Sequence, residues 1–244
     1  MEEVMVEALL SCDREARILA ARGIRNLTSK QRHQLAESGV LQPLVLMLCS
    51  QDYEAIEAAL LALLSLAFGS ESQIIQFIVF SGAVVTLLRL ICGSDKSSKL
   101  TEKAVALLEK IVSSSQDALR KTASMDGAIQ GLVEIVEDSS RQSQEHAVGI
   151  LLFICQSCRD RYRGLILTEG AMPGLLQLSG DGSRRAKEMA NALLLLLRDC
   201  SSPGLRKKQL NNDFLEEVMR HIDRGGKDGT GLRLVEEMIA KLRT

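Results

Sequence analysis

The stretch GAMPGLLQL, residues 170–178, decides the fold, because the chain contains it four times in related form. The related stretches begin at Gly39 (GVLQPLVLML), Gly82 (GAVVTLLRLI) and Gly127 (GAIQGLVEIV). Successive glycines are separated by 43, 45 and 43 residues. A fixed period of about 40–47 residues is typical of all-α solenoids, in which short helices stack in repeated units.

Around each glycine the same order of elements is expected. The glycine suits a sharp corner between two helices, since it tolerates a positive φ. A motif helix follows, then a polar break and a longer apolar helix. Two helices precede the first full unit, near residues 2–11 and 14–28, with Asp13 as an N-cap. The four units are expected to have helices at 31–38, 39–49 and 53–68; 70–81, 82–92 and 99–113; 115–126, 127–137 and 141–157; and 158–169, 170–179 and 183–199.

The long helices share an internal pattern. Each has an alanine followed four and seven residues later by Leu or Ile, at Ala59, Ala104, Ala147 and Ala190. This spacing places all three residues on one face, which we expect to be buried. A glutamate precedes each alanine by two residues, at Glu57, Glu102, Glu145 and Glu188. We interpret these glutamates as stabilising the helix, because a carboxylate is favourable near a helix N-terminus.

Composition limits the classes of function. The 244 residues have a net charge of −1, so no nucleic-acid partner is expected. No apolar run reaches the roughly 18–20 residues that cross a bilayer, so no transmembrane segment is expected. The acidic start Met1-Glu2-Glu3 is unlike a signal peptide, and the six cysteines lack a disulfide pattern. A cytoplasmic or nuclear location is predicted.

The sequence divides into two parts. Residues 2–200 are predicted to form the repeat array, with about four to five repeats of which the first is incomplete. Residues 209–244 show two further apolar stripes and are predicted to form a C-terminal helical hairpin or cap. A solenoid needs such an element to cover its last apolar face.

Several stretches show a family resemblance, namely GVLQPLVLML at 39–48, EKAVALLEKI at 102–111, EHAVGILLFICQSCRDRYRGLILTEGAMPGLLQL at 145–178 and FLEEVMRHI at 214–222. They resemble plant armadillo-repeat proteins, in particular the repeat region of plant U-box ubiquitin ligases. The resemblance implies a right-handed superhelix of three-helix repeats, with long helices lining a concave groove, that serves as an interaction scaffold. No U-box stretch is visible, so ligase activity is not expected of this chain alone.

No catalytic or cofactor site is predicted. Cys155 and Cys158 have the CxxC spacing, but a structural zinc site usually needs two such pairs. We therefore interpret them as packed thiols. The three histidines fall in different units, and a solenoid separates distant repeats in space. The chain is expected to be neither an enzyme nor a metal or cofactor binder.

The groove of armadillo proteins that resemble nuclear-import receptors has a ladder of Trp and Asn. Carried over by that resemblance, the Trp positions fall on Arg22, Leu61, Ala106, Gly149 and Ala192. The Asn positions fall on Asn26, Ser65, Lys110, Phe153 and Leu196. Only Asn26 matches, so cargo binding of that kind is not expected.

A mostly small and apolar stripe remains in the C-terminal half of the array and suits an amphipathic helix. We hypothesise a protein-binding surface made of Asn26, Leu61, Ser65, Ala106, Lys110, Gly149 and Phe153. In the competing interpretation, residues 209–244 fold back and cover this surface.

Two basic clusters lie 25 residues apart in the sequence. They consist of Arg159, Arg161 and Arg163, and of Arg184 and Arg185. Aligned on one edge, they would attract an acidic peptide or a phosphate group. The alternative is an ordinary solvated helix surface.

The leading functional prediction is a non-enzymatic scaffold that binds peptides or helices of other proteins along the groove. One alternative is a substrate-binding component of a ubiquitin ligase system. Another is a membrane-peripheral adaptor that uses the arginine edge. The partner and the oligomeric state are not predicted.

Overall fold

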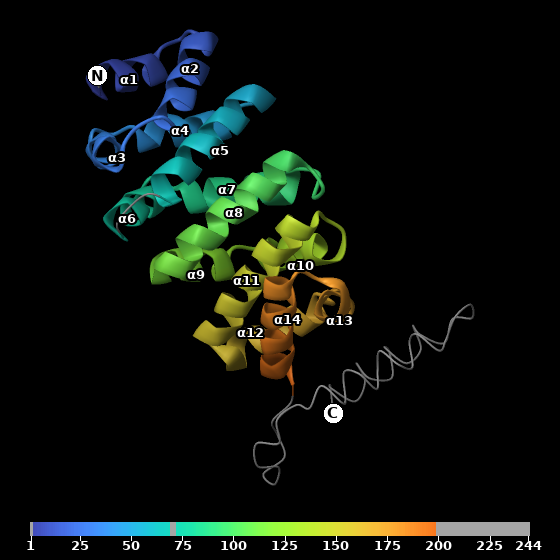
Figure 1. The fold of residues 1–244 in the computed structure, drawn as a ribbon. Helices are drawn as coiled ribbons and strands as arrows, with labels where there is room; N and C mark the ends of the chain where they lie inside the picture. Colours follow the sequence, from blue (N-terminus) through green and yellow to red (C-terminus); the bar gives the residue numbers. More distant parts are fainter. Residues whose placement is uncertain (1, 69–71, 199–244) are drawn as a thin grey trace.

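The computed structural model describes residues 2–68 and 72–198, and within them every regular element is an α-helix (Figure 1). The first seven are α1 (Glu2–Leu10), α2 (Arg14–Ile24), α3 (Ser29–Glu37), α4 (Leu41–Leu48), α5 (Tyr53–Phe68), α6 (Ser72–Phe80) and α7 (Ala83–Gly93). The next seven are α8 (Lys99–Ser114), α9 (Gln116–Ser124), α10 (Ala128–Glu137), α11 (Arg141–Ser157), α12 (Arg159–Thr168), α13 (Met172–Asp181) and α14 (Arg184–Leu197). The prediction of an all-α chain is confirmed for these residues.

The four repeat glycines stand where the sequence pattern predicts them. Gly39, Gly82, Gly127 and Gly170 have φ values of 89°, 82°, 75° and 82°. This left-handed backbone conformation strains most other residues, so glycine allows the turn into the motif helix. The turn lets each motif helix pack across the helices before and after it.

Serine and aspartate N-caps begin the long helices. Asp13 accepts a hydrogen bond from the backbone N–H of Glu15 at the start of α2, as predicted. Ser98, Ser140 and Ser183 accept from the third residue of α8, α11 and α14. Each cap satisfies a backbone donor that the helix leaves unpaired.

The core runs through the stack along the long helices. Ala59, Ala104, Ala147 and Ala190 are fully buried, as their spacing predicts. The Leu and Ile residues four and seven positions later are buried too, except Leu194 of α14, which is half-buried. Small residues in this column let adjacent helices approach closely.

The long helices α2, α5, α8, α11 and α14 pack side by side in chain order. Figure 1 shows the helices following one another down the molecule, from α1 to α14. The stacking brings residues about 40 positions apart in the sequence next to each other, and so creates a continuous face made of long helices. The predicted cap at 209–244 lies outside the described residues.

No single helix within 2–68 and 72–198 is long and apolar enough to cross a membrane, although the bent pair Gln73–Phe80 and Ala83–Gly93, at 66° to each other, passes by length and composition.

Candidate protein-binding face

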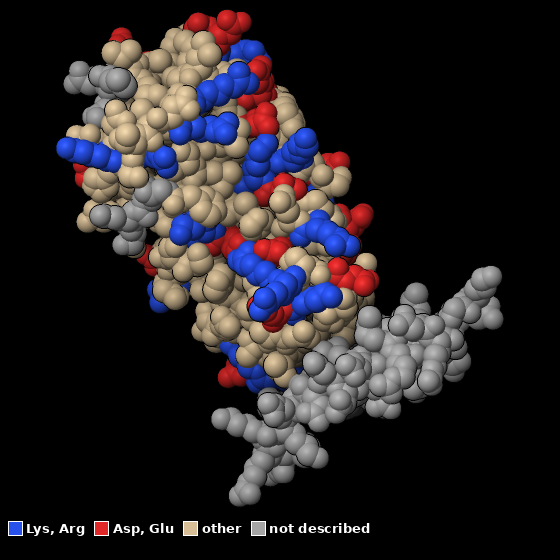
Figure 2. Space-filling view, viewed as in Figure 1, with Lys and Arg blue, Asp and Glu red and all other residues tan. Residues whose placement is uncertain are grey.

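The face made by the long helices has two regions. Linked acidic and basic side chains on neighbouring long helices form one region, which we call the ion ladder. Mostly uncharged side chains that are half-buried or exposed form the other, which we call the apolar strip: Leu61, Ser65, Phe68, Ala106, Lys110, Phe153 and Leu196. Figure 2 shows acidic and basic side chains alternating along the face turned toward the viewer.

The ladder begins between α2 and α5. Arg14 Nε lies 2.5 Å from Asp52 Oδ2, and Arg14 also donates to Glu54 at 3.1 Å. Arg22 donates to the other oxygen of Glu54 at 2.7 Å. These hydrogen bonds lower the pKa of both carboxyls below the ordinary range, mainly through Arg14 for Asp52 and through Arg22 for Glu54. The first two long helices are therefore joined by charge-assisted hydrogen bonds.

The glutamate column joins neighbouring repeats. The hydroxyl of Ser140, the N-cap of α11, donates to Glu102 of α8 at 2.6 Å. The hydroxyl of Ser183, the N-cap of α14, donates to Glu145 of α11. Each serine thus caps its own helix and bonds the preceding long helix. These glutamates were expected to stabilise only their own helices. The constant offset of 38 residues, from Glu102 to Ser140 and from Glu145 to Ser183, could have indicated a contact between neighbouring repeats.

Glu109 on α8 links three long helices. It is only 7% exposed, yet its carboxylate lies 2.7 Å from His146 Nδ1 of α11 and 2.5 Å from Arg185 Nη2 of α14. Arg185 also donates to Glu145 at 2.9 Å. Burial opposes the charge of Arg185, but the hydrogen bond to Glu145 and the charge of Glu109 together raise its pKa. A buried carboxylate needs such partners to remain stable.

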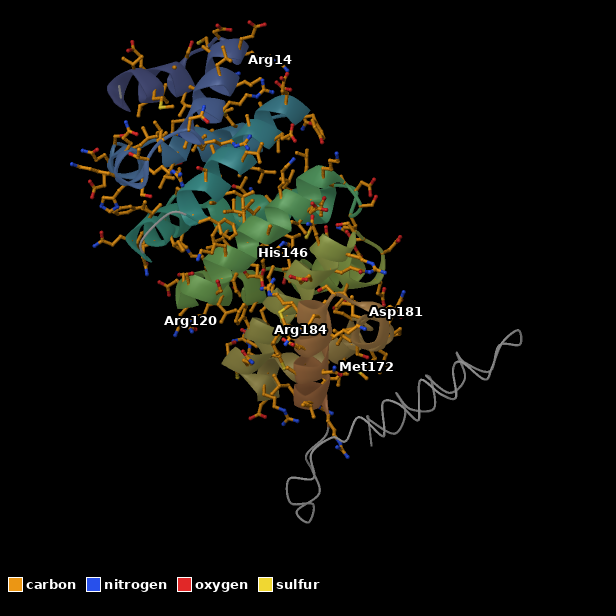
Figure 3. The ribbon with its side chains drawn as sticks, viewed as in Figure 1. Arg14, Arg120, His146, Met172, Asp181 and Arg184 are labelled. Atoms are coloured by element: carbon orange, nitrogen blue, oxygen red, sulfur yellow. The ribbon has the colours of Figure 1, made fainter. Side chains whose placement is uncertain are left out.

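Sequence reasoning missed Glu109, although its position signals an exception. The corresponding residues of α5, α11 and α14 are Leu64, Leu152 and Leu195. In Figure 3, Arg14 lies toward one end of the stack, His146 near its middle and Arg184 toward the other end. The ladder therefore extends along the described array, with Glu109 as its most buried member.

Gly149 does not belong to the exposed surface that we predicted. It is buried, and a Cβ atom placed on it would lie 2.4 Å from Oε1 of Glu109. The glycine leaves the space in which the Glu109 carboxylate crosses α11 to reach Arg185. Gly149 is accordingly covered by the ion ladder and does not form an open trough, which corrects its placement in the apolar stripe.

The other predicted groove residues lie at or near the surface. Leu61, Ser65, Ala106, Lys110 and Phe153 are half-buried, and Asn26 is exposed. Their role in binding stays a prediction.

Phe68 was missed, although it follows Leu61 by seven residues on the same helix face. It is 62% exposed, and Lys110 Nζ lies 5.7 Å from the centroid of its ring. This cation–π contact joins α5 to α8 within the strip.

The structure does not bring the five arginines together on one edge. Arg159 and Arg163, on α12, donate to the backbone oxygens of Leu196 at 2.6 Å and Leu197 at 2.7 Å. They therefore satisfy carbonyls at the C-terminus of α14, where cations are favourable.

The second arginine cluster lies at the N-terminus of α14, whereas the first cluster contacts the C-terminus of that helix. Arg184 and Arg185 begin α14, whose 14 residues span about 20 Å. Arg184 pairs with Glu188 at 3.1 Å, and Arg161 contacts the ring of its neighbour Tyr162. The predicted single arginine edge is wrong, because the two clusters, 25 residues apart in sequence, stand on helices of different type and meet opposite ends of α14.

No group of three or more His, Cys, Asp or Glu side chains suited to a metal ion occurs in the part of the chain that the structure describes. The two cysteines of the CxxC spacing are in different environments. Cys155 is fully buried, and burial raises the pKa of its thiol, whereas Cys158 is exposed where α12 begins. The packed-thiol interpretation holds for Cys155 alone.

Comparison with known proteins agrees with the repeat architecture. The family described as the plant U-box protein ARM repeat region matches residues 2–214. Comparison with curated proteins gives no match.

Several solved structures share the fold. A crystal structure of computationally designed armadillo repeat proteins for modular peptide recognition is 26% identical, with a TM-score of 0.71, and the match covers 80% of this chain and 82% of that chain. A designed armadillo repeat protein in complex with the peptide (KR)4 is 25% identical, with a TM-score of 0.64 and 80% of each chain covered. An engineered protein that is 22% identical covers 99% of this chain and 98% of its own, with a TM-score of 0.70.

Proposed function

The chain belongs to the family of plant U-box protein ARM repeat regions, and from that premise we propose that it is a non-enzymatic scaffold that binds segments of other proteins along its apolar strip. The observation that supports this proposal is the exposure of apolar side chains on consecutive long helices. Phe68 is 62% exposed, and Leu61, Ala106 and Phe153 are half-exposed beside it in the repeat register. Exposed apolar side chains that recur on neighbouring elements are typical of interaction sites.

The division of the long-helix face supports the same function. Side chains of the ion ladder are bonded to each other, so their hydrogen-bonding capacity is largely used within the fold. The strip offers apolar area at the same face, in a repeating arrangement suited to a peptide or an amphipathic helix. One of the similar structures is of proteins designed for modular peptide recognition, and another is of a designed protein in complex with a peptide, which adds support by likeness.

The test is peptide selection on the whole chain. A display library of random 16-residue peptides would be panned against the protein, and the selected peptides would be measured against an Ala106→Arg variant. Arginine at this half-buried position on α8 would cover the part of the strip that lies between Leu61 on α5 and Phe153 on α11. Ser124→Arg, on an exposed position at the end of α9, adds the same side chain away from the long-helix face.

We expect the selected peptides to lose at least about tenfold in affinity for Ala106→Arg and to bind Ser124→Arg unchanged. Circular dichroism melting would show that both variants are folded. If no peptide depends on Ala106 while the variant remains folded, the strip is not the binding surface and the proposal fails.

A second candidate is the substrate-binding part of a ubiquitin ligase system, and the family match is what favours it. The expected result is co-purification of a ubiquitin-conjugating enzyme or a U-box protein with the chain. Ala106→Arg would then reduce ubiquitin transfer to the bound protein while leaving that association intact. Transfer that is unaffected by Ala106→Arg would contradict a substrate-binding role for the strip.

The membrane-adaptor alternative has less support, because the arginines on which it depends are divided between the two ends of α14. Arg159 donates to backbone oxygens, and Arg185 donates to Glu109 and Glu145. A cytoplasmic or nuclear place of action is retained as a proposal, and imaging of a fluorescent fusion in plant cells would test it.

A further inference from the structure

Lys110 is the charged exception in the apolar strip. Two rows of equivalent positions cross α5, α8, α11 and α14, and of these eight residues only Lys110 is ionisable; the others are Leu61, Ala106, Gly149, Ala192, Ser65, Phe153 and Leu196. Its side chain is half-buried, so part of its stem is already removed from water. A cation in these surroundings indicates a specific requirement for positive charge on the strip.

No carboxylate of the described residues pairs with Lys110. The ion pairs along the face join Arg14 and Arg22 to α5, Lys103 to Glu57, and Arg185 to Glu109 and Glu145. Lys110 instead has its ammonium group over the ring of Phe68, at 5.7 Å from the centroid. The cation–π contact holds the ammonium group at the surface of the strip while its N–H donors remain available to a carboxylate.

The ladder also limits which charges of a partner the face attracts. Glu54, Glu57, Glu109 and Glu145 all accept from basic side chains of this chain. Their negative charge is thus compensated within the fold, and a basic peptide would have to displace those donors. A peptide such as (KR)4, bound by one of the structurally similar designed proteins, therefore does not fit the charge of this face.

We propose that the segment bound by the strip is apolar and contains an acidic side chain, Asp or Glu, that pairs with Lys110. This inference rests on the proposed function, because it names the chemistry of the partner at the same surface. Leucine or aromatic side chains on either side of the carboxylate would cover Leu61, Ala106 and Phe153. Covering them removes water from the Lys110 pair, and a salt bridge strengthens as the local dielectric constant falls.

The test uses the peptides selected on the whole chain, together with a synthetic (KR)4 peptide. Their dissociation constants would be measured by fluorescence anisotropy for the wild type, Lys110→Glu and Lys121→Glu. Lys121 is exposed on α9 and gives the same change in net charge away from the strip. A second panning of the library on Lys110→Glu tests whether the preferred charge reverses.

The expected result is that wild-type peptides are enriched in Asp or Glu flanked by apolar residues and lose about tenfold or more in affinity for Lys110→Glu only. Panning on Lys110→Glu should select Lys or Arg in place of the acid. Peptides that depend on Ala106 but lack an acidic residue, or that bind Lys110→Glu as well as the wild type, would overturn this inference and leave the proposed function standing. Peptides whose affinity is unchanged by both Ala106→Arg and Lys110→Glu would overturn this inference and the proposed function.

Discussion

The ion ladder and the apolar strip differ in how their side chains are satisfied. In the ladder, Glu109 is buried and bonded to His146 and Arg185, so one carboxylate joins α8, α11 and α14. In the strip, Phe68 is 62% exposed and the other residues are only half-buried. The difference indicates that the two regions have different roles. The ladder fixes the repeats relative to one another, and the strip remains open to a partner.

The largest expected effect comes from removing the centre of the ladder. Glu109→Ala leaves Arg185 and His146 without their shared acceptor and creates a cavity, and we expect it to lower the free energy of unfolding by about 3 kcal/mol. Urea unfolding followed by circular dichroism measures it.

The matched variant is Glu109→Leu, which introduces the residue found at the equivalent position of α5, α11 and α14. Leucine fills the cavity but also leaves Arg185 and His146 without their shared acceptor, so we expect Glu109→Leu to lose about 1–2 kcal/mol, less than Glu109→Ala. Full stability of Glu109→Leu would show that the bonds of the Glu109 carboxylate do not stabilise the stack.

Gly149→Ala is expected to have the next largest effect. The new Cβ would lie 2.4 Å from Oε1 of Glu109, so the buried carboxylate must move away from Arg185. We expect a loss of about 2 kcal/mol even though alanine favours the helix. The thermal midpoint and the urea midpoint both report it.

Gly164→Ala on α12 is the control, because a Cβ there meets nothing within 4 Å, and it should stabilise by about 0.5–1 kcal/mol. The double variant Glu109→Leu with Gly149→Ala recreates the leucine and alanine that the preceding pair of long helices has, at Leu64 of α5 and Ala106 of α8. It should be about as stable as Glu109→Leu alone, and a further loss of stability from Gly149→Ala in that background would contradict the assigned role of Gly149.

The bonds between N-cap serines and glutamates should give a smaller effect. Ser140→Ala removes a helix cap, a contact with the hydroxyl of Ser143 and the bond to Glu102, whereas Ser98→Ala removes the equivalent cap and hydroxyl contact without a bond to a preceding long helix. A cap contributes about 1 kcal/mol, so we expect a further loss of about 0.5–1 kcal/mol for Ser140→Ala. Urea midpoints that are identical for the two variants would argue against a contribution from the bond between repeats.

The smallest effect is a pH dependence of the ladder. Burial opposes the charge of Glu145, but the hydrogen bonds from Ser183 and Arg185 outweigh it and lower the pKa below the ordinary 4.5. A lowered pKa stabilises the fold fully above 4.5, and that stabilisation is lost as the pH falls through the pKa of the folded state. The melting difference between the wild type and Glu145→Gln should therefore shrink between pH 6 and pH 3.5. A constant difference would contradict the assignment.

Much of the fold was predictable from the sequence, because its determinants repeat at a fixed interval. The glycine corners, the alanine column and the order of helices all follow from residues such as Gly127 and Ala104, whose local chemistry decides their role. The repeat register also placed Leu61, Ala106 and Lys110 at the surface of the long helices.

The ladder was not predictable in the same way, because its members break the repeat. Glu109 occupies a leucine position, and its effect depends on Gly149 and on Arg185, which lies 76 residues further along the chain. The prediction of a single arginine edge was wrong for a related reason. The sequence spacing of the two clusters does not show that Arg159 stands at the start of α12, facing the end of α14, while Arg184 begins α14.

The central claim is that stability and binding are separated between the ladder and the strip. The most direct test measures the free energy of unfolding and the affinity for one selected peptide in both Glu109→Ala and Ala106→Arg, in the same buffer. The account predicts that Glu109→Ala loses about 3 kcal/mol of stability but keeps its affinity within about threefold, while Ala106→Arg keeps its stability within about 1 kcal/mol and loses at least about tenfold in affinity. If both quantities fall together in both variants, the ladder and the strip form one functional unit and the claim is contradicted.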